Sequence, residues 1–199
     1  TRARTDGGSP AEILRRVGAL ALAAAGGRTG ADRREIVAGQ LPVETWPEQR
    51  VLIPAVSAET GERRVFDRDS GLDVVDAVIA TTASFGMPLL FFQGEHYFDG
   101  GYYSSDNADL AAGYDRVLIL SLIRPPGVPF VPLISREESV TTLRISGSLV
   151  EVILPDENTL AAFAAAGSAM NPSISATAAR AGRMQGSKSV NERLLSFWR

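Results

Sequence analysis

The chain has 199 residues, of which 45% are apolar and 22% are charged, and its net charge at pH 7 is −3. This composition is typical of one globular domain, and the charge gives no general attraction to nucleic acid. Because the chain has no cysteine and a single histidine, His96, the sequence excludes disulfides, thiolate nucleophiles and histidine-rich metal sites.

The N-terminal part predicts two helices. Ser9 suits an N-cap and Pro10 suits the first helical turn, and apolar residues then recur at helical spacing up to Gly26. A second helix is expected from Asp32 to Ala38. The apolar stretch inside the first helix, Val17 to Ala25, is too short to span a bilayer.

The start of the sequence bears on the origin of the chain. It begins with Thr1 instead of Met, and Gly26-Gly27-Arg28 does not make a convincing signal-peptide cleavage site. We therefore expect the chain to be the C-terminal part of a longer protein that is cut upstream. We expect that protein to be cytoplasmic, because the chain shows neither a signal peptide nor a membrane-spanning segment.

The next segments predict a β-hairpin and a buried helix. Arg50 to Val56 is apolar, residues 59–62 suit a turn, and Arg64 to Phe66 is the expected returning strand. Asp73 to Ala83 leaves almost no polar face, which is typical of a helix that is buried on most sides.

A break at residues 86–88 ends this helix and introduces the most informative part of the sequence. Leu89 to Phe92 is apolar, Gly94-Glu95 suits a tight turn, and Tyr97-Phe98 leads into Asp99. A short helix is expected from Asn107 to Ala112.

The C-terminal half predicts two strands among helices. Arg116 to Leu122 and Leu149 to Leu154 are nearly all apolar, which is typical of strands buried on both faces of a parallel sheet. A proline-rich loop is expected over 124–132, and helices are expected over 137–145, 155–166 and 172–182. Strands that alternate with helices indicate an α/β fold with a mostly parallel sheet, in which sites lie at the carboxyl ends of strands.

Several segments, taken in order, resemble the patatin-like phospholipase family. They are residues 17–22, 46–47, 58–62, 65–71, 75–78, 97–101, 107–111, 178–183 and 185–186. The resemblance implies an α/β fold that is a three-layer sandwich with a mostly parallel central sheet. Residues 1–199 would form the C-terminal part of that domain, without its N-terminal strand and nucleophile elbow.

The resemblance also implies a mechanism. The family is similar to serine acyl hydrolases that use a Ser–Asp dyad, with the serine in a G-x-S-x-G elbow and the aspartate in a D-G-[GA] motif. The second motif matches Asp99-Gly100-Gly101, so Asp99 would be the general base. The first motif does not occur in the 199 residues, so this chain would supply only the aspartate half of the dyad.

The residues around Asp99 suit such a base. An apolar environment makes a carboxylate a better base, and the candidate walls are Phe85, Leu90, Phe91, Phe92, Tyr97 and Phe98. Gly100 and Gly101 allow unusual backbone angles and a close approach of substrate. Ser104 and Asn107 are the candidate residues that support the loop. The local sequence alone favours the plainer interpretation, in which Asp99 caps its own turn.

Other candidates are weaker. His96 is expected to be exposed and to have no role in a dyad. Ser148 lacks the second glycine of an elbow, and Ser9 is better explained as an N-cap. Asp106 and Asp109 are expected to lie at the start of the short helix.

Two functions therefore remain open at the level of sequence. The first is a lipid acyl hydrolase that needs no cofactor and no metal, acts on glycerophospholipids or related acyl esters, and contacts membranes peripherally. The second is a non-catalytic relative that binds a lipid or a protein. Neither hypothesis gives the chain a nucleic-acid partner or fixes its oligomeric state.

Overall fold

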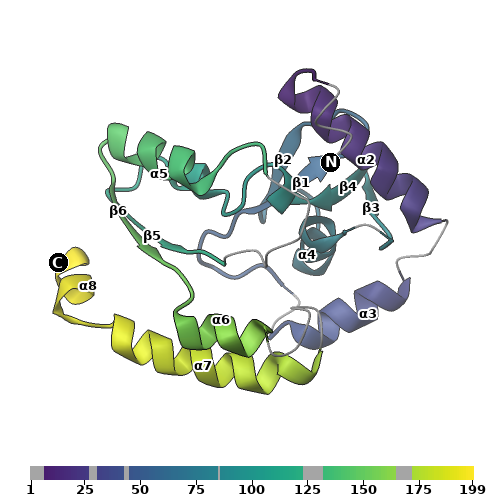
Figure 1. The fold of residues 1–199 in the computed structure, drawn as a ribbon. Coiled ribbons are helices and arrows are strands. Elements are labelled where there is room, and N and C mark those ends of the chain that lie inside the picture. The colour runs from purple at the N-terminus through teal and green to yellow at the C-terminus, as the bar shows by residue number, and fades with distance from the viewer. Residues whose placement is uncertain (1–6, 27–30, 43–44, 85, 123–131, 165–171) are drawn as a thin grey trace. The chain divides into compact units, whose positions relative to one another are not determined.

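The computed structural model of the chain describes residues 7–26, 31–42, 45–84, 86–122, 132–164 and 172–199 (Figure 1). The chain divides into two compact units, which are described separately. Unit 1 comprises Thr1–Leu110 and Phe130–Arg136, and unit 2 comprises Ala111–Pro129 and Glu137–Arg199.

Unit 1 contains a four-stranded antiparallel sheet. Its strands are β1 (Ile53–Ser57), β2 (Arg63–Phe66), β3 (Leu90–Phe92) and β4 (Glu95–Asp99), in the order β2-β1-β4-β3. The predicted hairpin is confirmed as β1 and β2. Gln93 and Gly94 both have positive φ, as a two-residue hairpin turn requires, and this turn makes β3 and β4 antiparallel.

Helices cover both faces of this sheet. On one face, α2 (Pro10–Ala25) buries Leu14 and Val17 against Val56 and Phe98. The predicted N-cap is confirmed, because Ser9 and Glu12 form a reciprocal capping box. The other face is covered by α4 (Val74–Thr82), whose small residues pack against the second core cluster. That cluster includes Ala55, Phe66, Leu72, Ala77, Ala80 and Tyr97.

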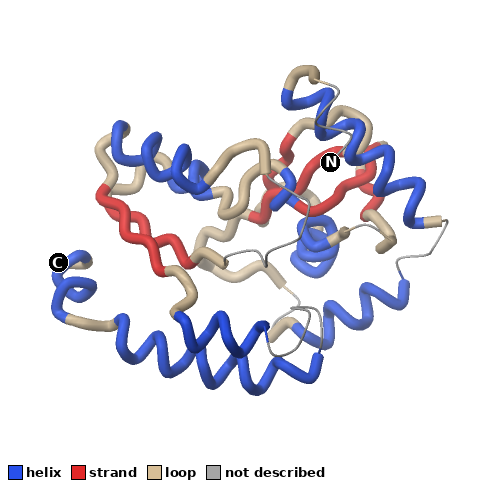
Figure 2. The backbone as a smooth tube through the Cα atoms, viewed as in Figure 1, coloured by secondary structure: helices blue, strands red, loops and turns tan. Residues whose placement is uncertain are grey.

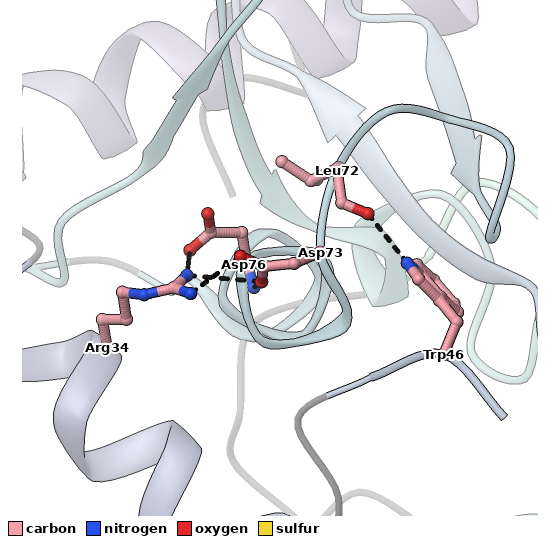
Figure 3. Close-up of polar contacts among 5 residues, drawn as sticks. All are labelled: Arg34, Trp46, Leu72, Asp73 and Asp76. Carbon is pink, nitrogen blue, oxygen red and sulfur yellow. Dashed lines mark hydrogen bonds and ion pairs between the residues drawn. The ribbon is translucent and has the colours of Figure 1, made fainter.

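A third helix, α3 (Ala31–Gln40), packs against α4 and extends past Gly39. Figure 3 shows Arg34 of α3 directed at the first turn of α4. Its guanidinium lies 2.7 Å from Asp73 Oδ2 and also pairs with Asp76. In the same view Trp46 Nε1 donates to the Leu72 carbonyl oxygen at 2.8 Å. These contacts tie α3 and the segment at Trp46, both of which precede the hairpin, to the start of α4.

We expect the Arg34 contact to make stability depend on pH through Asp73. Burial raises the pKa of Asp73, but hydrogen bonds from Arg34 and from the Asp76 backbone N–H lower it, and the net pKa lies below the usual value. A lowered pKa stabilises the fold above the unfolded pKa of about 4, and this contribution disappears as the pH falls through the folded pKa.

The substitution Asp73→Asn isolates this effect, because asparagine remains a good N-cap but carries no charge. At pH 7 the variant should lose at most about 1 kcal/mol of unfolding free energy, since the pair is partly exposed. Urea unfolding from pH 7 to pH 3 should show the two proteins converging at the acid end. A difference that stays constant with pH would contradict this account.

Unit 2 contains a parallel pair of strands, which are drawn in red in Figure 2. They are β5 (Arg116–Leu120) and β6 (Leu149–Ile153), and α5 (Arg136–Ile145) lies between them in the chain. The two strands and their parallel direction agree with the sequence. The prediction that both faces of these strands are buried is wrong for the described residues. Val117 and Ile119 are buried, whereas Leu120 is 71% exposed and Leu149 is 57% exposed.

The remaining helices of unit 2 are α6 (Glu157–Ala164), α7 (Ser175–Ser189, after a short turn at Pro172–Ile174) and α8 (Glu192–Phe197). Gln185 of α7 joins α7 to the start of α6. Its side-chain oxygen accepts from the Asp156 backbone N–H at 3.0 Å and from the Thr159 hydroxyl at 2.9 Å, and its amide donates to the Leu154 carbonyl oxygen at 2.6 Å.

The described strands therefore confirm an α/β protein but not a mostly parallel sheet. Three of the four strand pairings are antiparallel and one is parallel. Short turns connect β1 to β2 and β3 to β4, and such turns cannot join parallel neighbours. The predicted proline-rich loop lies almost wholly outside the described residues. Within those residues, no helix is both long and apolar enough to cross a bilayer.

Candidate functional site

Asp99 is the last residue of β4, where it lies opposite Ala55 of β1. Its backbone N–H donates to the Ala83 carbonyl oxygen at 3.0 Å, just after the end of α4. The residue is half-buried. The chain therefore leaves the sheet at Asp99, and the backbone at this point is held by both β1 and the end of α4.

The turn that follows Asp99 orients its carboxylate. Residues Gly100–Tyr102 form a 3₁₀ turn, η1, and Asp99 is its N-cap. The Gly101 backbone N–H donates to Asp99 Oδ1 at 2.7 Å. This is the capping geometry that the plainer interpretation of Asp99 predicts. The role of Asp99 as a base stays a prediction.

Gly100 is required for close packing in this turn. It is buried, and a Cβ at this position would overlap with the Pro54 carbonyl group of β1. The Thr81 hydroxyl of α4 donates to the same carbonyl oxygen at 2.5 Å. The turn therefore rests directly on the backbone of β1, and no residue with a side chain fits there without movement.

Asn107 and Ser104 hold the other side of the turn. Asn107 has a positive φ of 46°, and its side-chain amide donates to the Gly100 carbonyl oxygen at 3.2 Å and to the Ser104 carbonyl oxygen at 2.9 Å. The Asn107 backbone N–H donates to Ser104 Oγ at 3.2 Å. The structure thus brings Asp99, Gly100, Gly101, Ser104 and Asn107 together, as the sequence predicts.

Arg63 completes this cluster, and the sequence did not indicate it. Its guanidinium donates to Asn107 Oδ1 at 3.1 Å and to both carboxylate oxygens of Asp109 at 2.9 and 2.5 Å. It also lies over the Tyr103 ring, 4.2 Å from the ring centroid. The hydrogen bond to Asp109 outweighs burial and raises the pKa of Arg63, so the guanidinium stays charged.

The sequence indicates only weakly that Arg63 belongs to this site. Arg63 and Arg64 are neighbours on one strand, so they point to opposite faces of the sheet. Which of them meets Asp109 depends on pairing between segments 46 residues apart. Asp109 does lie in the first turn of the short helix η2 (Ala108–Ala111), as predicted. Asp106 instead pairs with Arg136, at 3.2 Å.

The aromatic residues before Asp99 do not wall a single cleft beside it, and that prediction is wrong for the described residues. Phe98 packs in the core under α2, and Tyr97 packs in the core under α4, because successive strand residues point to opposite faces. Leu90 and Phe92 pack with Tyr97. Phe91 is 62% exposed and lies against the His96 ring. Phe85 lies outside the described residues.

A pocket of about 260 Å³ does occur elsewhere in unit 1. It is lined by Trp46, Glu48, Gln49, Arg50, Val51, Asp67, Arg68 and Asp69. None of these residues belongs to the Asp99 turn or to the candidate walls of Asp99, so this pocket is not the apolar environment that the sequence predicts.

The three alternative catalytic residues are engaged in other contacts. His96 Nδ1 lies 2.7 Å from Glu59 Oε1, and His96 precedes Asp99 by three strand residues, so the two side chains point to opposite faces. Ser148 is buried and donates its hydroxyl proton to the Tyr114 carbonyl oxygen at 2.7 Å. Ser9 caps α2. Within unit 1, neither His96 nor Ser9 is arranged as a partner of Asp99.

Comparison with known protein families finds no family model that matches the chain, and comparison with curated proteins finds no significant relative. Within the described residues, no group of three or more histidine, aspartate or glutamate side chains is placed to hold a metal ion.

Proposed function

We propose that the chain supplies the general base of a lipid acyl hydrolase, with Asp99 as the aspartate of a Ser–Asp dyad. One observation carries the proposal. Asp99 ends a strand, its Oδ1 is fixed by the Gly101 N–H, and the turn behind it is pressed against β1 at Gly100. A carboxylate fixed on rigid elements is what a base that acts without a histidine requires.

In the proposed reaction a serine hydroxyl transfers its proton to the Asp99 carboxylate as its oxygen attacks an ester carbonyl carbon. The tetrahedral intermediate then loses the alcohol, which takes the proton from Asp99, and an acyl-serine ester remains. Water attacks this ester by the same route, with Asp99 again accepting the proton. The fatty acid leaves as the serine oxygen takes this proton back from Asp99, which regenerates both the serine hydroxyl and the carboxylate.

The proposal places the nucleophile in a segment that precedes Thr1 and carries the G-x-S-x-G elbow. It also includes a patatin-like three-layer sandwich in which further parallel strands adjoin β5. The exposed Leu120 and Leu149 support this architecture, since parallel pairs are ordinarily covered on both faces. The proposed substrates are glycerophospholipids or related acyl esters at a membrane surface.

The test begins with the reading frame upstream of the codon for Thr1. We call the product of the complete frame the full-length protein. We expect this protein to contain a G-x-S-x-G motif and to hydrolyse a short-chain nitrophenyl ester. The 199-residue chain alone should release no more nitrophenol than buffer does, because it holds no activated serine.

Two results would contradict this proposal. The first is a complete frame without the motif, which would favour the alternative of a non-catalytic lipid- or protein-binding relative. The second is ester hydrolysis by the 199-residue chain that Ser148→Ala or Ser9→Ala abolishes, which would place the nucleophile inside the chain.

A further inference from the structure

We propose that Arg63 is a positioning residue for Asp99, acting through Asn107 and the Gly100–Gly101 peptide group. The proposal rests on the function proposed for Asp99. It adds a residue from a different strand to the site and states how that residue controls the carboxylate.

The first step lies in one peptide group. Its carbonyl, from Gly100, accepts a hydrogen bond from the Asn107 side chain at 3.2 Å, and its N–H, from Gly101, donates to Asp99 Oδ1 at 2.7 Å. The group is planar, so its C=O and N–H rotate together. A bond that fixes the carbonyl therefore fixes the donor that orients Asp99, and the two bonds polarise each other.

The second step is the way in which Asn107 is held. Its amide nitrogen donates to two carbonyl oxygens, so its Oδ1 must face a donor, and that donor is Arg63 at 3.1 Å. Arg63 thus selects the amide orientation that places the NH₂ group against Gly100. Without Arg63 the side-chain oxygen of Asn107 loses the partner that sets this orientation.

The third step is the rigidity of Arg63 itself. Its side chain is only 14% exposed, both oxygens of Asp109 bind it, and the Tyr103 ring lies against it. A planar guanidinium can at the same time make the bidentate contact with Asp109, the hydrogen bond to Asn107 and the contact with the Tyr103 ring. A lysine ammonium keeps the charge but cannot reproduce this geometry.

Arg64 provides a matched control. It is the next residue of β2 and points to the other face, where it donates to the Tyr97 hydroxyl at 3.0 Å and to Gln93 Oε1 at 2.7 Å. It also lies over aromatic rings, including that of Phe92 at 5.3 Å. Arg64 therefore has similar contacts but no link to the Gly100–Gly101 peptide group. Arg63→Lys and Arg64→Lys disturb the same strand to a similar degree.

The experiment measures kcat and KM for a nitrophenyl ester in the full-length protein. Because small misplacements of a reacting group are costly, Arg63→Lys should lower kcat on the order of 10–100-fold with little change in KM. Arg64→Lys should change kcat less than about twofold, as expected for a residue outside the reacting geometry. Equal effects of the two variants on kcat would overturn the proposal.

A second pair of variants separates the amide of Asn107 from its backbone conformation. Asn107→Gly keeps the positive φ and removes the amide, whereas Asn107→Ala loses both. We expect Asn107→Gly to melt near the wild-type temperature and still show the reduced kcat. A glycine variant that restores wild-type kcat, with only the alanine variant impaired, would show that the backbone conformation alone matters and would overturn the proposal.

Hydrogen exchange at the Gly101 amide gives a readout that does not require activity. Arg63→Lys and Asn107→Gly should speed this exchange, while Arg64→Lys should leave it unchanged. Unchanged exchange in all three variants overturns the proposal.

Asp99→Asn in the same series separates the positioning role of Arg63 from the proposed function of Asp99. If Asp99→Asn is inactive and the Arg63 and Asn107 variants keep wild-type kcat, the positioning role fails while the proposed function stands. If Asp99→Asn is fully active, the proposed function itself fails.

Discussion

Asp99→Asn should reduce the kcat of the full-length protein by about 10²–10⁴-fold, toward the upper end of that range. Asparagine has nearly the same shape, but its amide does not accept the serine proton. A dyad has no second base to compensate for this loss. The measurement is the steady-state rate of ester hydrolysis at saturating substrate.

The fold should survive this substitution. Asparagine keeps a side-chain oxygen that accepts the Gly101 N–H, so the cap of η1 is retained. The melting temperature should therefore lie within a few degrees of the wild-type value. Asp69→Asn is the control, since Asp69 is an exposed turn residue of the same unit, and its rate should be unchanged. A large drop in melting temperature for Asp99→Asn would mean that the lost rate reflects lost structure.

Gly100→Ala should damage both stability and activity. The added methyl group overlaps with the Pro54 carbonyl of β1, so either the strand or the turn must move. Overpacking of this kind costs about 1–3 kcal/mol of unfolding free energy. Movement of the turn also displaces the Gly101 N–H from Asp99, and a displacement near 1 Å lowers the rate on the order of 10²-fold.

Gly39→Ala is the matched control for this glycine. Gly39 lies in α3 of the same unit, and a Cβ there meets no atom within 4 Å. Alanine is the better helix former, so this variant should gain up to about 1 kcal/mol and keep full activity. Urea unfolding and ester hydrolysis of both variants check the prediction. A Gly100→Ala protein with wild-type stability and rate would show that the close approach to β1 is unimportant.

Local signals in the sequence predicted much of the secondary structure. The N-cap at Ser9, the hairpin around residues 59–62 and the buried helix after Asp73 each depend on neighbours within a few residues, and the structure confirms each of them. Asn107 was likewise identified near Asp99 because it lies only eight positions away.

Features that depend on pairing between distant segments were not predicted. The apolar run around Tyr97 gives no sign that β1 lies antiparallel beside it, and the run around Leu120 gives no sign that one face of the strand is exposed. Arg63 was missed for the same reason, since its contact with Asp109 exists only once β2 and η2 are brought together. Side-chain direction follows from register, and register is a property of the folded chain.

The most direct test of the Asp99 assignment compares His96→Ala with Asp99→Asn in the full-length protein, with kcat and melting temperature measured for both. His96 pairs with Glu59 and points to the opposite face from Asp99, so the dyad gives the histidine no role in catalysis. We predict that His96→Ala keeps most of its rate and that Asp99→Asn loses nearly all of it at unchanged stability. An inactive His96→Ala beside an Asp99→Asn that retains most of its rate would contradict the assignment of Asp99 as the base.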